Sequence, residues 1–134
     1  MENQAAAKAS KTCGEILMRI IYLGNVLCIA QSLAQLPGVK VAAFVYEDEM
    51  DRQLFLRLGQ RYGVNSHRIR DKEELSYILE QYRGLDLGII ANFGKILTQQ
   101  HIQSCRLGWI NAHPGQLPQN AGRNPVQQAL EQGY

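Results

Sequence analysis

Short apolar runs alternate along the chain with segments whose apolar residues recur every three or four positions. The runs are rich in β-branched and aromatic residues and nearly continuous, which is typical of strands buried on both faces of a parallel sheet. Strands are therefore predicted at 18–24 (MRIIYLG), 39–47, 85–94 and 107–111, with a weak and ambiguous edge strand at 65–70.

The segments between these runs have the spacing of helices with one apolar face. Helices are predicted within 25–38, 49–63 and 71–84, in a short segment from about Thr98, and at 124–133. Several carry end signals: Asn25 as the cap of the first helix, Pro37 and Gly38 as its stop, and Asp71 with Glu74 as a capping-box pair.

Strand and helix alternate with short connections, which predicts βαβ units. The expected fold class is α/β, a Rossmann-like parallel sheet with helices on both faces. Residues 1–17 are small and polar, and we expect a flexible tail there, followed by one domain over residues 18–134.

Composition narrows the function classes only modestly. The 134 residues include 46% hydrophobic and 19% charged positions, and 14 Lys and Arg stand against 12 Asp and Glu. A net charge of +2 gives no argument for nucleic acid or a membrane surface. The three cysteines form no Cys-x-x-Cys pair, and with the three histidines they show no zinc spacing. We expect a cytoplasmic protein with no metal site and no membrane segment.

Polar residues stand at the ends of three predicted strands: Gly24 with Asn25, Asn92 to Gly94, and Asn111 to His113. Ligands of open α/β sheets bind at the carboxyl ends of strands. If the first, fourth and fifth strands are neighbours, these three ends face one crevice.

Asn111 and His113 are two residues apart, so on an extended backbone they point to the same side. An amide can stabilise a developing oxyanion and an imidazole can move a proton, which is what acyl or formyl transfer to an amine requires. The alternative is that Asn111 caps a turn before Pro114 and that His113 packs at the strand end.

Other chemistry has weaker support. The turn after the first strand has no Gly-x-Gly-x-x-Gly, and the chain has no P-loop motif, so dinucleotide binding and P-loop hydrolysis are unsupported. His67 and His101 are expected to have surface or packing roles. The acidic run 47–51 is expected to be a solvated loop, and Asp86 starts its strand, at the wrong end of the sheet to assist His113.

The segment INAHPGQLPQNAG resembles the Asn-x-His-Pro-Ser-x-Leu-Pro-x-x-x-Gly signature of the folate-dependent formyltransferases. This family includes methionyl-tRNA, glycinamide ribonucleotide and sugar-nucleotide formyltransferases. DLGIIANFGKIL is similar to the family's segment upstream of that signature, and MRIIYLGN is similar to its opening strand. The resemblance covers 18–134 and implies the N-terminal catalytic domain of such an enzyme.

The resemblance implies a role for each strand end. Asn111 and His113 match the catalytic pair. The segment of Asn92, Phe93, Gly94, Lys95 and Leu97 would hold 10-formyltetrahydrofolate, the formyl donor, with backbone around Phe93, Lys95 and Leu97 against the pterin.

Gly24 and Asn25 would contact the substrate, an amine acceptor such as a tRNA-linked amino acid or an amino sugar nucleotide. The glycine-rich phosphate loop of the glycinamide ribonucleotide branch does not follow Leu23, which favours the tRNA or sugar branch.

The sequence departs from the family signature at two positions. Gly115 stands where the family has Ser, and Ala121 stands where it has Arg, although Arg123 comes just after the motif's last glycine. The family's catalytic Asp lies on a later loop, so we expect a domain truncated before that loop and no significant transferase activity from residues 1–134 alone. The alternatives are a non-catalytic interaction module that forms a homo-oligomer through an open sheet edge, and a nucleotide-sugar binding module that uses Gly24 and Asn25.

Overall fold

The computed structural model describes residues 17–112. These residues form one parallel sheet in the order β3-β2-β1-β4-β5. The strands are β1 (Met18–Gly24), β2 (Val39–Tyr46), β3 (Asn65–Arg68), β4 (Leu87–Ala91) and β5 (Trp109–Ala112). The α/β class and the weak edge strand are both confirmed.

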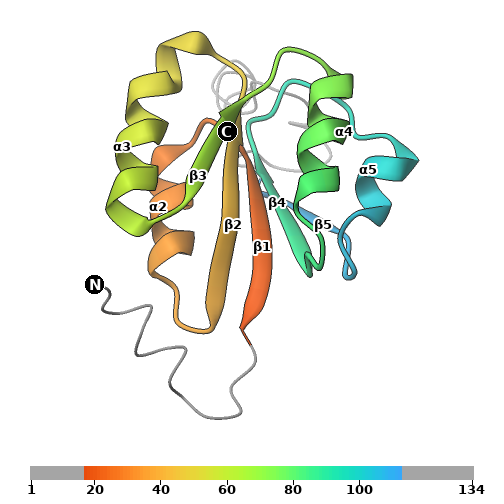
Figure 1. Cartoon of the computed structure of the whole chain (residues 1–134), viewed down its shortest axis with the longest axis horizontal. Helices are drawn as coiled ribbons and strands as arrows, with labels where there is room; N and C mark the ends of the chain where they lie inside the picture. Colours follow the sequence, from red (N-terminus) through yellow and green to blue (C-terminus); the bar gives the residue numbers. More distant parts are fainter. Residues whose placement is uncertain (1–16, 113–134) are drawn as a thin grey trace, which may run out of the picture.

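Helices cover both faces of the sheet. They are α2 (Leu27–Gln35), α3 (Arg52–Tyr62), α4 (Lys72–Gln81) and α5 (Gln99–Gln103), with a 3-10 turn, η1 (Glu49–Asp51), before α3. Figure 1 shows α2 and α3 on one side of the sheet and α4 and α5 on the other. This arrangement follows from right-handed crossovers, because the chain moves outward from β1 to β3 and then returns to β4 and β5.

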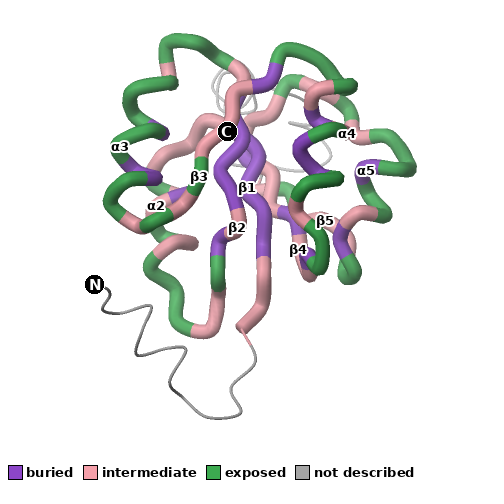
Figure 2. The backbone as a smooth tube through the Cα atoms, in the orientation of Figure 1, coloured by how far each residue is buried: buried purple, intermediate pink, exposed green. Residues whose placement is uncertain are grey.

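The core consists of two layers that share β1. Ile21 and Leu23 face α4, whereas Ile20 and Tyr22 face α2 and α3. Tyr22, Phe44, Tyr46 and Phe55 form an aromatic cluster in the second layer, with ring centroids 5.0–6.3 Å apart. Figure 2 shows the buried residues concentrated along β1 and β2. A β1 buried on both sides explains its continuous apolar run.

Several helix ends agree with their sequence signals. Asp71 accepts a hydrogen bond from the Glu74 N–H at 2.9 Å, Thr98 caps α5, and Gly63 ends α3 with a φ of 70°. The predicted cap of the first helix is wrong, since α2 begins at Leu27 with Val26 as its N-cap. Some sequence-based predictions concern residues outside the described range. They are the tail, except for residue 17, His113, the prolines of its motif and the helix at 124–133.

Candidate functional site

The carboxyl ends of β1, β4 and β5 lie side by side. Gly24 of β1 pairs with Ala91 of β4, and Ala91 pairs in turn with Ala112 of β5. The chain leaves β1 toward β2 on one side and β4 toward β5 on the other. The boundary between β1 and β4 is therefore a topological switch point, where open α/β sheets bind ligands.

Gly24 brings β1 and β4 into unusually close contact at this boundary. Its φ is 148°, and a Cβ added to it would lie 1.9 Å from the Ala91 carbonyl oxygen. The same oxygen accepts a hydrogen bond from the Asn25 N–H at 3.2 Å. A glycine is required here both for the backbone angle and for the absence of a side chain.

Asn25 and Asn92 meet across this boundary. The Asn92 side-chain amide donates to Asn25 Oδ1 at 3.0 Å, which explains why Asn25 does not cap α2. The φ of Asn92 is 56°, a left-handed conformation that Asn tolerates better than most residues. Within residues 17–112, Asn92 Oδ1 is buried and has no hydrogen-bond partner, so it can still accept one.

The 92–98 segment connects β4 to α5 without regular secondary structure. Phe93 and Leu97 pack against the core layer beneath α4, whereas the side chain of Ile96 is 81% exposed. The apolar side chains thus anchor the segment, and its irregular backbone leaves peptide groups that do not belong to a helix or sheet ladder.

Glu47 fixes the middle of this segment from the end of β2. Its Oε1 accepts the Gly94 N–H at 2.7 Å, and its Oε2 accepts the Lys95 ammonium at 2.6 Å. The acidic run was predicted to be solvated, and this is wrong for Glu47, whose side chain is only 16% exposed. The contact joins residues 48 positions apart, so no local pattern reveals it; the one available signal was a carboxylate directly after a strand.

Asn111 lies on β5 opposite Ile90, one residue before the level of Ala91, and it is exposed. Two residues earlier, Trp109 packs against the core layer on the α4 side, so Asn111 lies on the same face of the sheet. His113 lies outside the described residues. Asn111 thus lies near the carboxyl end of β5, on the strand next to β4, which leads into the 92–98 segment.

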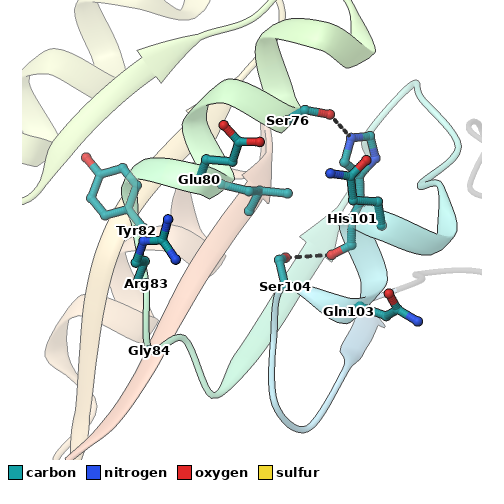
Figure 3. Close-up of a pocket in the computed structure, with 10 residues that line it drawn as sticks. Ser76, Glu80, Tyr82, Arg83, Gly84, His101, Gln103 and Ser104 are labelled. Carbon is teal, nitrogen blue, oxygen red and sulfur yellow. Dashed lines mark hydrogen bonds between the residues drawn. The ribbon is translucent and has the colours of Figure 1, made fainter.

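A separate pocket lies between α4 and α5, with a volume of about 370 Å³ (Figure 3). On its wall, His101 Nδ1 accepts the Thr98 N–H at 3.1 Å, so Nε2 carries the proton toward Ser76 Oγ at 2.8 Å. Burial lowers the pKa of His101, which favours this neutral form. These contacts confirm a packing role for His101.

This pocket lies away from the carboxyl ends of the strands. Arg83 and Gly84 line the pocket and precede β4, so the pocket is at the amino edge of that strand. Asp86 is at this edge too, where its carboxylate accepts the Arg19 N–H at 2.8 Å and pairs with Arg106 at 3.1 Å. Asp86 is thus a structural residue, as its sequence position indicated.

The described residues contain no group of three or more His, Cys, Asp or Glu side chains arranged to hold a metal ion. None of the helices described is long and apolar enough to cross a membrane. Burial raises the pKa of the Cys105 thiol, which keeps it protonated and unreactive.

Comparison with known proteins agrees with this geometry. The family model described as Formyl transferase matches residues 29–134. The chain belongs to this family. The match includes Asn92 to Leu97 and Asn111, the residues placed at the carboxyl edge.

Two individual proteins show how far the similarity extends along the chain. It is 39% identical over 131 residues to methionyl-tRNA formyltransferase from Thermotoga maritima, covering 87% of this chain and 41% of that protein. It is 33% identical over 81 residues to mitochondrial formyltetrahydrofolate deformylase 2 from Arabidopsis thaliana, covering 58% of this chain and 25% of that protein.

A solved structure, phosphoribosylglycinamide formyltransferase from Anaplasma phagocytophilum, superposes with a TM-score of 0.71 at 25% identity. The superposition covers 88% of this chain and 60% of that one. In sequence, the chain spans about two fifths of the length of the Thermotoga maritima methionyl-tRNA formyltransferase.

Proposed function

We propose that this chain contributes the N-terminal, folate-binding part of an enzyme that transfers a formyl group from 10-formyltetrahydrofolate to an amine. The observation that carries the proposal is that β5, which bears Asn111, pairs with the carboxyl end of β4, from which the 92–98 segment departs. Membership of the formyl transferase family supports the same reaction class.

The residues at this edge suit a folate donor. A pterin presents a flat pattern of donors and acceptors, which irregular backbone can match with peptide N–H and C=O groups. Among residues 17–112 the buried Asn92 Oδ1 has no hydrogen-bond partner, and we propose it as an acceptor for a ligand N–H. When bound, the folate supplies the formyl group, and Phe93, Lys95 and Leu97 carry the backbone proposed to hold its pterin.

Asn111 and His113 would act on the reacting atoms. As the amine nitrogen bonds to the formyl carbon, the formyl oxygen gains negative charge, which the Asn111 side-chain amide stabilises by donating a hydrogen bond. The attacking nitrogen must lose a proton and the departing folate nitrogen must gain one. His113 is the residue proposed to carry this proton.

The acceptor is proposed to be an aminoacyl-tRNA or an amino sugar nucleotide that contacts Gly24 and Asn25. After β1 the chain passes through Asn25 and Val26 straight into α2, so no glycine-rich phosphate loop forms there. The 39% identity to a methionyl-tRNA formyltransferase supports the tRNA alternative. We place the reaction in the cytoplasm.

The test is calorimetric titration of 5-formyltetrahydrofolate, a stable analogue of the donor, into the 134-residue chain. Wild-type protein should bind it saturably. Asn111→Ala should weaken binding by about 3- to 10-fold, the loss expected for one hydrogen bond. Asn65→Ala, the same change on the distant edge strand β3, is the matched control. A folded chain that binds no analogue, or that loses equal affinity in both variants, would contradict the proposal.

A further inference from the structure

We propose that Glu47 is a positioning residue for the folate site: it holds the 92–98 segment across the carboxyl end of β1 and thereby sets the affinity for the formyl donor. The proposal rests on the proposed function for its ligand. It assigns a role to a residue that contacts the segment and not the reacting atoms.

The geometry of the contact is a two-point attachment. One carboxylate oxygen takes a backbone N–H, that of Gly94, and the other takes a side-chain ammonium, that of Lys95. The side chains of Glu47 and Lys95 are only 16% and 20% exposed, so water and salt screen the pair less than a surface ion pair. Charge-assisted hydrogen bonds of this kind are stronger than neutral ones.

Topology makes this attachment consequential. β1 lies between β2 and β4, and neighbouring strands are about 4.8 Å apart, so the ends of β2 and β4 are separated by roughly 10 Å. Glu47 follows β2 and Gly94 follows β4, and their contact therefore bridges the end of β1.

Glu47 is itself fixed from the far side. Arg68 of β3 donates from Nε to the Glu47 carbonyl oxygen at 2.9 Å. The Ile69 N–H also donates to the carbonyl oxygen of the preceding residue, Tyr46, at 2.9 Å. The carboxylate thus projects from backbone that is held at two points by the end of β3, which is the support a positioning residue requires.

The same contacts indicate which group is available to a ligand. The Lys95 ammonium is engaged by Glu47, so its charge serves to shape the segment. What Lys95 offers the folate is backbone, in agreement with the backbone role proposed above. A preformed segment binds its ligand without the entropic cost of ordering it first.

Two matched measurements test the proposal: hydrogen exchange of the Gly94 amide and affinity for 5-formyltetrahydrofolate. Glu47→Ala removes both contacts and should speed exchange at Gly94 by about tenfold or more, with a comparable loss of affinity. Glu47→Gln keeps an acceptor for the Gly94 N–H but loses the ion pair, so its effects should be smaller.

The second variant pair isolates the ion pair. Lys95→Met should match Glu47→Gln, and the double variant should be no worse than either alone, because both remove one interaction. Glu80→Gln, the same chemical change on α4, should alter neither measurement. Exchange of the Ile21 to Leu23 amides in the same spectra shows whether each variant is still folded.

The outcomes separate this proposal from the proposed function. Unchanged Gly94 exchange in a folded Glu47→Ala protein would overturn the positioning role, as would faster exchange with undiminished analogue affinity. Failure of the wild-type chain to bind the analogue would count against the proposed function and against any effect of Glu47 on affinity. Faster exchange together with weaker binding supports both.

Discussion

Gly24→Ala perturbs the contact between β1 and β4 at the candidate site. The new Cβ would lie 1.9 Å from the Ala91 oxygen and 2.7 Å from its carbonyl carbon, both inside the 3.0 Å that real Cβ atoms keep. Both atoms are backbone, so no side-chain rotation relieves the overlap. The two strand ends must separate by about 1 Å, or the turn into α2 must change.

The magnitude follows from two terms. An alanine at a φ of 148° costs about 1–3 kcal/mol in backbone strain. The overlap with Ala91 adds about 1–3 kcal/mol, as overpacking in a closely packed interior does. Gly38→Ala is the matched control, because the φ of Gly38 is 79° and a Cβ there meets nothing within 4 Å. Gly24→Ala should therefore be about 2 kcal/mol more destabilising than Gly38→Ala.

Urea unfolding followed by circular dichroism measures the difference. With an m-value of about 2 kcal/mol/M, the midpoint for Gly24→Ala should lie about 1 M below that for Gly38→Ala. Equal midpoints for the two variants would refute the reasoning, because they would show that the close approach of β1 to Ala91 contributes nothing beyond backbone strain.

Three other predictions concern the fold that supports the site. Burial lowers the pKa of His67 and of His101 from 6.5, so below that pH the unfolded chain binds more protons than the folded one. The urea concentration at the unfolding midpoint should therefore decrease as the pH is lowered from 7 to 5. Burial raises the pKa of Tyr22 to about 12, so this group should lower the unfolding free energy by about 2–3 kcal/mol between pH 9 and 12, and Tyr22→Phe should remove that part of the pH dependence. Asp71→Ala removes the α4 cap and should cost about 1 kcal/mol, measured by thermal unfolding, whereas an unchanged melting temperature would contradict the cap's role.

The parts of the fold that local chemistry determines could be predicted from sequence. The apolar runs predicted four of the five described strands; a strand buried on both faces, such as β1, admits few polar residues. The polar edge strand β3 was predicted only as weak and ambiguous. Asp71, Thr98 and Gly63 marked helix ends, because each acts on backbone groups within four residues of itself. The sequence left the strand order as a condition, that the first, fourth and fifth strands are neighbours, and the observed order β3-β2-β1-β4-β5 meets it.

Contacts between distant segments could not be predicted in this way. Asn25 was expected to cap α2, but the Tyr22 hydroxyl accepts the Val26 N–H at 2.9 Å, and Asn25 pairs with Asn92, 67 positions away. Glu47 looked like part of a solvated acidic run until the fold brought Lys95 to it. Such partners are decided by which strands become neighbours, and single-sequence patterns carry no information on them.

The central claim is that a folate binds where β1, β4 and β5 end, against the 92–98 segment. The most direct test is a ¹⁵N-labelled sample of the 134-residue chain titrated with 5-formyltetrahydrofolate and observed amide by amide. The account predicts saturable shifts at Phe93 to Leu97 and at Asn25 and Asn111, with the amides of α3 unmoved. Shifts confined to the pocket between α4 and α5, or no shifts in a folded chain, would contradict it.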